Sequence, residues 1–300
     1  MDTAQRWYGR TFVSVIALLV FTAFIGPQLN QSAALAVLVA GVVLLGLPHG
    51  ALDPEVARKA FAGRRYSTVV FYVSYLALVL IYWLLWNRYP TTGLVFFLLI
   101  AALHFGSDWA SRGNFVTRCA YGLTVVTLPL LRFPSEVMAI YAMLGAGHAA
   151  ALVTVSRIIA PAAVTVAAIG AGLQFRQRQA DALELVCIVA GSLFLQPLVF
   201  FTCYFSLLHS PRHLFETAQH LGMTSLKSIF RATATVVVAT LVLAGIAYSR
   251  LAHLGIAPSV LRIVFIGLAA LTVPHMLLDA VVEAENERRA DVSNATCRTV

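Results

Sequence analysis

Residues 198–216 have the sequence "LVFFTCYFSLLHSPRHLFE". The stretch begins as an uncharged apolar run and ends with two histidines, His209 and His213, which are four residues apart and have Pro211 between them. An uncharged apolar run is typical of a membrane-crossing helix, whereas proline removes a backbone donor and interrupts a helix. The stretch therefore predicts a membrane helix that is broken where it presents two imidazoles.

The composition of the whole chain indicates the same class of protein. Of its 300 residues, 60% are hydrophobic and only 11% are charged, and the mean hydropathy is +0.83. Such a chain cannot present a charged surface to water, so we expect an integral membrane protein. The net charge of +8 comes from basic residues scattered over short connecting segments. This pattern argues against a nucleic-acid partner and is typical of the charge bias that orients membrane helices.

Apolar runs punctuated by Gly, Pro or Arg recur along the chain. They predict a single all-α domain over residues 1–300, a polytopic transmembrane bundle of about 8–10 helices, with a catalytic part at about 32–285 and a short polar tail at 286–300. We expect the first run to be a retained helix rather than a cleaved signal peptide. The four cysteines show no CxxC spacing, which argues against a disulfide framework or a thiolate metal site. The clear runs are 11–26, 32–48, 67–86, 93–106, 182–208, 232–249 and 258–282.

The segment between residues 119 and 173 is the ambiguous part of this organisation. Its run at 137–173 is too long for one helix, and we expect two crossings with a turn near Arg157. The basic loop "RKAFAGRRY" at 58–66 indicates the cytoplasmic side, and two crossings bring the basic loop at 210–231 to that side as well. The expected protein is a multi-pass protein of the cell inner membrane with both termini in the cytoplasm.

Three apolar segments end in related words that contain a histidine and an aspartate four residues apart. On a helix this spacing places the two side chains on one face, one turn apart. Ionisable groups at membrane depth are costly and tend to face the bundle interior in pairs, so such pairs predict a functional site. The words are "GLPHGALD" with His49 and Asp53, "ALHFGSD" with His104 and Asp108, and "VPHMLLD" with His275 and Asp279.

Proline accompanies most of these histidines: Pro48 precedes His49, Pro274 precedes His275, and Pro211 lies between His209 and His213. Each proline frees a backbone carbonyl, which membrane proteins tolerate only inside the protein or beside a wet cavity. Ser210 and Pro211 suit an N-cap and a first helical position. We therefore expect His209 to end one helix and His213 to lie in the first turn of the next, both directed at one centre.

Neutral imidazole is a common ligand of iron, zinc and copper, and a ligating ring usually donates its other N–H to a carboxylate or a carbonyl. Asp53, Asp108 and Asp279 are candidates for such partners. A lone membrane histidine more often forms a hydrogen bond between helices, but convergence of several favours a metal site. His148, His220 and His253 have neither an aspartate partner nor a proline and are expected at interfaces or in loops.

In this order on apolar helices, the words "PHGALD", "HFGSD", "HSPRH" and "PHMLLD" resemble the Brp/Blh family of membrane β-carotene 15,15′-dioxygenases over about residues 40–285. The resemblance implies an iron(II) enzyme that splits the central double bond of β-carotene into two molecules of retinal. It implies iron ligands at His49, His104, His209 and His213, with His275 in a further motif. One departure is Pro54, where the family often has histidine after the aspartate.

The chemistry of this reaction agrees with the residues. Zinc can occupy a histidine site, but inserting dioxygen into an alkene needs a metal that shares electrons with it, as iron or copper can. Of these two metals, we expect iron(II). Four neutral imidazoles leave coordination positions open for dioxygen. Both oxygen atoms leave in the two aldehydes, so no reductant is required, and the chain has no nucleotide-binding fingerprint.

A carotenoid is an apolar molecule dissolved in the bilayer, so its site requires an apolar tunnel within the bundle. Aromatic residues at helical spacing around the histidines are candidates to line it, although such residues also pack on each other or face lipid. They are Phe97, Phe105, Trp109, Phe201 and Phe205.

Two other classes of protein remain open at this point. A membrane metal or proton transporter can use His/Asp pairs as relay sites, although the chain shows no inverted repeat of broken segments. A di-iron desaturase or hydroxylase uses HxxxH words, but it is expected to have more histidines and HxxHH boxes. Metal content, dioxygen consumption and product analysis separate these classes, and retinal as product suggests delivery to a rhodopsin-like partner.

Overall fold

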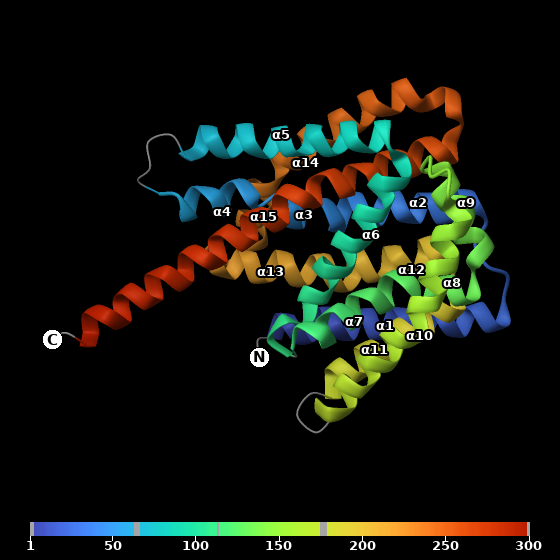
Figure 1. The fold of residues 1–300 in the computed structure, drawn as a ribbon, viewed down its shortest axis with the longest axis horizontal. Helices are drawn as coiled ribbons and strands as arrows, with labels where there is room; N and C mark the ends of the chain where they lie inside the picture. Colours follow the sequence, from blue (N-terminus) through green and yellow to red (C-terminus); the bar gives the residue numbers. More distant parts are fainter. Residues whose placement is uncertain (1–2, 63–66, 113, 175–178, 299–300) are drawn as a thin grey trace.

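The computed structural model describes residues 3–62, 67–112, 114–174 and 179–298. Over these ranges the chain forms helices and no strand. Seven helices are long and apolar enough to cross a membrane, or up to eight if the bent pair Phe115–Arg132 and Pro134–Met143 counts as one span, again over the described residues. The predicted all-α membrane bundle is confirmed (Figure 1).

The first part of the chain supplies two of the helices that hold histidines, α3 with His49 and α6 with His104. The bounds are α1 Thr3–Ile25, α2 Gln31–Gly41, a π-helical turn at Val42–Gly46, α3 Leu47–Gly50, α4 Asp53–Ala60, α5 Ser67–Arg88, α6 Pro90–Gly106 and a 3₁₀ helix at Ser107–Arg112. Those that follow are α7 Phe115–Thr127, α8 Pro129–Arg132, α9 Pro134–Met143 and α10 Ala149–Gln174. The last are α11 Gln179–Phe194, α12 Pro197–Cys203, a π-helical turn at Tyr204–His209, α13 Ser210–His220, α14 Leu226–Leu251, a 3₁₀ helix at Ala252–Leu254 and α15 Ile256–Arg298.

Local sequence accounts for where these helices begin. The side chains of Asn30, Asn114 and Ser225 accept hydrogen bonds from the first backbone amides of α2, α7 and α14, which satisfies donors that a helix start leaves open. Proline opens α6 and α12 at the first turn, where its missing N–H costs nothing. The polar tail expected at 286–300 continues the helix, because α15 extends to Arg298.

The turn expected near Arg157 is wrong. Helix α10 runs unbroken through Arg157, and the long apolar run divides earlier, at residues 144–148. Gly145 adopts a φ of 94° there, a left-handed conformation that ends α9 and that glycine adopts without strain.

The run at 182–208 also differs from the expectation of a single segment. Residues Leu195 and Gln196 interrupt it, and Pro197 starts α12. Figure 1 shows α12 and α13 returning along the bundle after α11, in line with each other. The chain reverses once more at this second break, which compensates for the absence of a turn near Arg157. The "HSPRH" word therefore still lies on the same side of the bundle as the other histidines.

Two prolines are preceded by π-helical turns instead of helix ends. The turn at Val42–Gly46 lies just before Pro48, and the turn at Tyr204–His209 lies just before Pro211. His209 keeps helical backbone angles (φ −61°, ψ −61°), so Ser210 is not an N-cap and the expected pair of separate helices is wrong. The segment from α12 to α13 is one rod in which the wide turn absorbs the proline.

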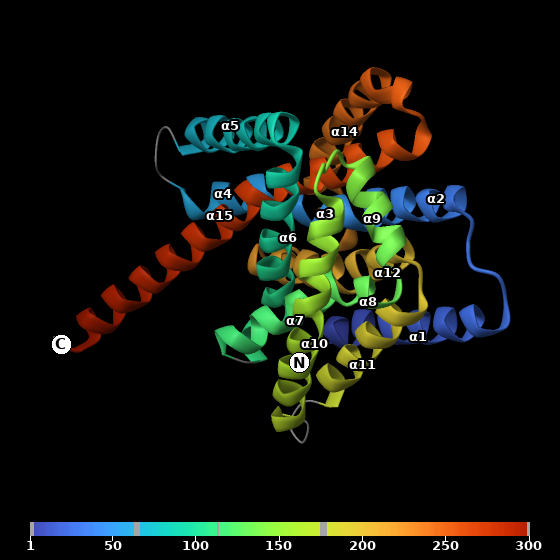
Figure 2. The ribbon, with the colours of Figure 1, turned by 45° about the vertical axis from the view of Figure 1, so that its right-hand side comes forward.

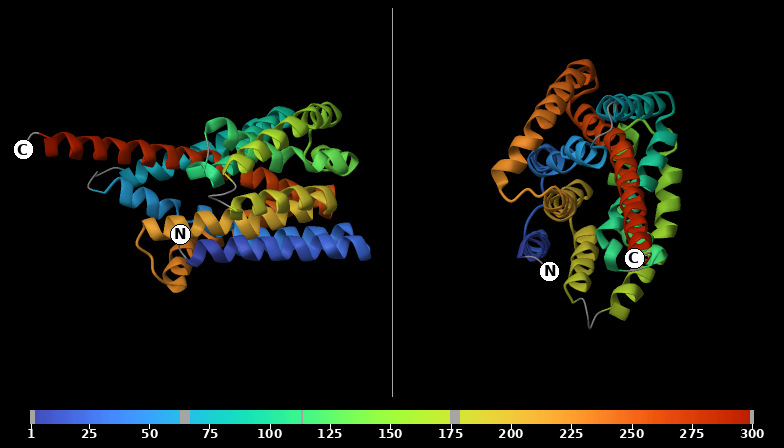
Figure 3. Two further views of the ribbon diagram at one scale, coloured as in Figure 1. Left: turned by 90° about the horizontal axis from the view of Figure 1, so that it is seen from below. Right: turned by 90° about the vertical axis from the view of Figure 1, so that its left-hand side faces the viewer.

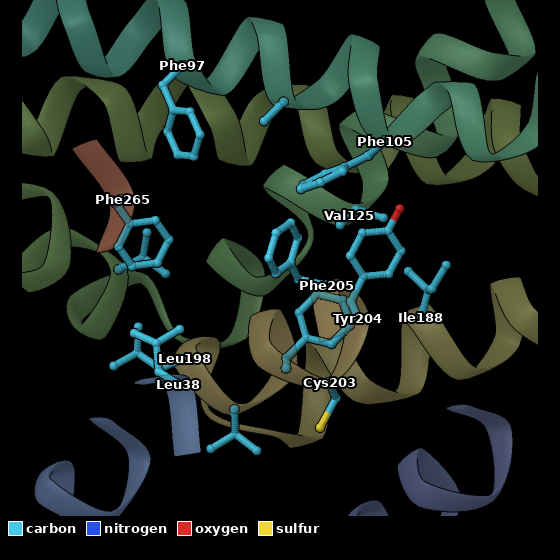
Figure 4. Packing of buried hydrophobic residues seen from close by; sticks show 14 of the residues in the cluster. Leu38, Phe97, Phe105, Val125, Ile188, Leu198, Cys203, Tyr204, Phe205 and Phe265 are labelled. Carbon is cyan, nitrogen blue, oxygen red and sulfur yellow. The ribbon is translucent and has the colours of Figure 1, made fainter. Parts of the chain in front are cut away.

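The core lies between α1, α2, α6 and the α12–α13 rod. Figure 4 shows the rings of Phe97, Phe105, Phe205 and Phe265 gathered in its centre, with Tyr204 beside them. Helix α14 lies outside it, whereas α5 contributes Tyr82 and Trp86 to it, and both helices pack on α15. In the right-hand view of Figure 3 they occupy the two sides of α15, and Figure 2 shows α14 at the edge of the molecule.

Candidate metal centre

Five histidines from separate parts of the fold meet inside the bundle. The ring centroids of His104, His209 and His213 lie 4.7–5.2 Å apart. The ring of His49 lies 5.5–6.5 Å from each of the other four, which include His275. Ligand atoms of two triplets, one with His49, His104 and His275 and one with His104, His209 and His213, lie within 4.8 Å of one another. All five histidines of the predicted site are therefore brought together.

Hydrogen bonds turn three of these rings so that Nε2 faces the centre. The Nδ1 atoms of His209 and His275 lie 3.0 Å and 2.8 Å from carboxylate oxygens of Asp108 and Asp53. The Nδ1 atom of His49 lies 2.5 Å from the carbonyl oxygen of Gly46. A carboxylate or a carbonyl only accepts, so each Nδ1 carries the proton and each Nε2 keeps a free lone pair.

The inward nitrogens have the arrangement that a metal ion requires. The Nε2 atoms of His104 and His209 lie 3.1 Å apart, close to the roughly 3 Å between two imidazole nitrogens that occupy adjacent positions about 2.1 Å from one ion. The buried Nε2 atoms of His213 and His275 make no hydrogen bond, and the carboxylate oxygens nearest to them, of Asp108 and Asp279, are 3.4 and 3.6 Å away. Buried polar atoms without partners are costly, and coordination of an ion would satisfy them. The residues therefore fit a metal.

Asp108 is the centre of the hydrogen bonding on one side of the cluster. Its carboxylate accepts from the Tyr204 hydroxyl at 2.7 Å and from His209, and His213 Nε2 lies 3.4 Å away. Its backbone carbonyl accepts from Arg212 at 3.1 Å. Asp53 has the same kind of role on the other side, because its second oxygen accepts from the Tyr75 hydroxyl at 2.9 Å.

The aspartates are thus those expected, but two of the expected pairs are wrong. Asp53 holds His275 instead of His49, and Asp108 holds His209 instead of His104. The reason is local, since α3 ends at Gly50 and α6 at Gly106. Neither pair shares one continuous helix, so the four-residue spacing loses its geometric meaning.

The third pair lies on the continuous helix α15. Asp279 Oδ2 is 3.6 Å from His275 Nε2, and the side chain of Asp279 is half exposed. The four-residue spacing therefore brings Asp279 near His275, but Asp279 holds the ring less closely than Asp53 does.

A buried ion pair next to the cluster was not predicted. Arg212, which is 1% exposed, donates from Nη2 to both carboxylate oxygens of Glu184 at 2.9 and 3.0 Å. Its guanidinium carbon also lies over the rings of Tyr8 and Trp109. The signal was present in the sequence, because an acid within an apolar membrane run needs a partner.

An apolar cavity of about 400 Å³ opens beside the histidines. Its walls include His49, His104 and His275 together with four of the predicted aromatic residues, Phe97, Phe105, Phe201 and Phe205. Sequence reasoning missed the wall that α5 and α14 supply, including Phe71, Tyr72, Tyr75, Val236 and Thr240. Nothing in the local pattern of those two helices distinguishes cavity-facing from lipid-facing residues.

Trp109 is the exception among the predicted aromatic residues. It is buried, stacks on Tyr121 at 4.5 Å and lies under Arg212, and it does not line the cavity. The prediction that it contacts substrate is wrong, because the 3₁₀ helix after Gly106 turns its side chain away from the face of His104. The three remaining histidines, His148, His220 and His253, are exposed as expected.

Known proteins are similar to this chain in sequence. Residues 40–283 match the sequence profile of the family described as beta-carotene 15,15'-dioxygenase. A protein from an uncultured marine bacterium (66A03), described as "Beta-carotene 15,15'-dioxygenase", is 30% identical over 267 residues, which cover 84% of this chain and 95% of that protein. No solved structure matches the chain.

Proposed function

The chain belongs to the β-carotene 15,15′-dioxygenase family, and we propose that it splits the central double bond of β-carotene with dioxygen to give two molecules of retinal. One carbon–carbon double bond is broken and two carbonyl groups form, each taking one oxygen atom, so the reaction balances without a reductant. The observation that carries the proposal is the convergence of five imidazoles, in two triplets that share His104, beside an apolar cavity. Family membership also makes the chain an oxidoreductase, which sets aside the transporter alternative.

The metal of the proposal is iron(II). Its ligands in the proposal are His49, His104, His209 and His213. His275 is a further candidate, because its ligand atom lies within 4.8 Å of those of His49 and His104. Bound there, iron(II) supplies the electron sharing that dioxygen needs in order to react with an alkene. Four imidazole ligands would leave coordination positions open for dioxygen on such an ion.

The protein's own residues position these ligands and keep water out. Asp108 and Asp53 hold the Nδ1 protons of His209 and His275, which keeps each ring in the tautomer that leaves Nε2 free. The hydroxyls of Tyr204 and Tyr75 donate to the same two carboxylates and fix their orientation. The aromatic wall of the cavity gives a polyene apolar surface along its length.

The substrate and the product are both soluble in lipid. We therefore propose that β-carotene enters from the bilayer of the cell inner membrane and that retinal leaves into it, where a rhodopsin-like partner can receive it. The basic loops place both termini in the cytoplasm in this proposal.

The first test is expression in a host that accumulates β-carotene. The wild-type chain is expected to bleach the cells and produce retinal, while His213→Ala, which removes a ligand, is expected to leave β-carotene intact and to contain at least about tenfold less iron. His148→Ala is the matched control, because His148 is exposed in a loop, and it should behave as wild type. Retinal is measured by chromatography and insertion by the yield in the membrane fraction.

Metal analysis of the purified protein completes this test. We expect about one iron atom per chain, loss of activity on chelation and recovery with ferrous iron. Stoichiometric zinc with full activity after removal of iron contradicts the iron assignment. Normal iron and cleavage in His213→Ala contradict the ligand assignment.

A further inference from the structure

A second apolar cavity, of about 330 Å³, lies under α14. We call it the distal chamber. It is bounded by α2 with the π-helical turn that follows it, by α14 and by α15, and its lining includes Val39, Gly245, Tyr248, Val260 and Gly267. It is open at the surface, where Val39, Gly245 and Tyr248 are exposed. Four residues, Leu47, Thr240, Leu268 and Leu271, line both the distal chamber and the cavity at the histidines. The two spaces are therefore neighbours that meet at these four residues.

The distal chamber extends away from the metal centre in a defined direction. On α15, Leu271 lies one turn before His275, and Gly267 lies eight residues before it, roughly 12 Å along the helix axis. Val39 lies on α2, ten residues before His49 of α3, and so also lies on the N-terminal side of its histidine. The cavity at the histidines has a part that extends the other way, toward Asp53 at the start of α4 and Phe71 near the start of α5. The histidines thus lie between this part of the cavity and the distal chamber.

The chamber is bounded by apolar surface. The hydroxyl of Thr240 donates to the carbonyl of Val236 at 2.9 Å, and that of Thr272, in the neighbouring cavity, donates to Leu268 at 2.8 Å. With both hydroxyls bound to the helix backbone, their methyl groups are what a ligand meets. Such walls suit a hydrocarbon.

Two glycines on separate helices leave room in the chamber. A Cβ atom added at Gly245 of α14 or at Gly267 of α15 would meet no atom within 4 Å. Glycine in the middle of a helix is destabilising relative to residues with a side chain. Close helix packing explains neither glycine. Gly245 lies at the exposed edge of the chamber, whereas Gly267 is half-buried and leaves room inside it.

We propose that the distal chamber binds one ring end of the carotenoid, while the cavity at the histidines holds the central double bond and the other end. The proposal rests on the proposed function and adds the placement of the substrate. A rod with a ring at each end can be cut in its centre only if space extends in both directions from the metal. The distance from His275 to Gly267 along α15 is of the order of the conjugated chain between the central bond and a ring. The chamber therefore sets which carotenoid length is cleaved at its centre.

Filling the chamber tests this placement. Gly267→Leu, and independently Gly245→Leu, put a side chain into the chamber, and both raise the intrinsic helix propensity. We expect kcat/KM for β-carotene to fall at least about tenfold. An apocarotenal that keeps one ring but is shortened at its other end should lose less than about threefold, because its short end does not reach the filled chamber. Gly172→Leu is the control, since Gly172 has open space at its Cβ on the outer face of α10, and it should leave both substrates unchanged.

A binding measurement separates this proposal from the proposed function. Protein stripped of metal is loaded with β-carotene, and the bound pigment per chain is read from its visible absorbance. We expect wild type and Gly172→Leu to retain β-carotene and the two chamber variants to retain at least about tenfold less. Equal retention by the chamber variants overturns the placement, as does equal loss of the long and the short substrate. Retention by the wild type without any cleavage would contradict the proposed function and leave the placement standing.

Discussion

At the scale of single residues, the aspartates set the geometry of the histidines from across the bundle. Asp108 lies on the 3₁₀ helix after α6, yet it holds His209 of the π-helical turn and accepts from Tyr204. Asp53, at the start of α4, holds His275 of α15. Each carboxylate therefore fixes a ring on another helix and links two elements in one contact.

This difference between the aspartates gives a residue-scale prediction. Asp108→Asn removes the charge that holds the Nδ1 proton of His209, and we expect iron affinity to fall about 10- to 100-fold. For Asp279→Asn we expect iron affinity to fall less than about threefold, because the carboxylate of Asp279 is half exposed and 3.6 Å from His275. Metal titration of the stripped protein measures both. An Asp279 variant as impaired as the Asp108 variant would show that spacing along the helix matters more than the contacts described above.

The sequence was sufficient to find the site residues but not to pair them. Histidine and aspartate in an apolar run are conspicuous, so all five histidines and all three aspartates were predicted. The partners depend on where α3 and α6 end, and each ends within a word that was treated as one helix. Trp109 was misplaced for the same reason, because the chain changes from α to 3₁₀ geometry between His104 and Trp109.

At the scale of helices, Pro211 acts through a π-helical turn and not through a helix end. Proline cannot donate to the carbonyl of Leu207, and the backbone widens over Tyr204–His209 instead. A widened turn rotates the residues after it relative to those before it. This rotation sets the directions of His209 and His213 on one rod.

Replacing this proline separates stability from activity. Pro211→Ala restores an amide and favours a regular helix, so the melting temperature in detergent should hold or rise while kcat and iron content fall through misdirected ligands. Pro161→Ala is the matched control, because Pro161 lies inside α10 with an exposed side chain. It should gain similar stability with unchanged activity. Full activity in Pro211→Ala would show that the wide turn does not depend on this proline.

At the scale of the whole molecule, composition predicted the membrane bundle. It could not predict where the chain breaks between residues 137 and 208. Hydropathy stays high through Gly145 and through Leu195 and Gln196, where the chain turns. It also stays high through Arg157, where the chain continues as helix. An apolar run shows that a segment lies in the membrane, but backbone conformation and packing decide where it reverses.

The orientation of the bundle follows from where its basic residues meet. Lys59 of α4 donates to the backbone carbonyl of His220 at the end of α13, so two basic loops that are distant in sequence lie at one end of the molecule. Arg58, Lys227 and Arg231 lie in the same two regions. Positive charge is enriched in cytoplasmic loops, and we therefore expect this end to face the cytoplasm.

Cysteine labelling from the periplasm checks this orientation. In a background that lacks the four natural cysteines, cysteines at Ala62 and His220 should stay unlabelled in intact spheroplasts and react after lysis. Cysteines at Gln28, between α1 and α2, and at His148, between α9 and α10, should react without lysis, since these exposed residues lie where the chain reverses at the opposite end. The reverse labelling pattern at all four sites would show that the protein is inserted in the opposite orientation. Labelling of His220 without Ala62 would contradict the arrangement itself, because the contact between Lys59 and His220 requires both on one side.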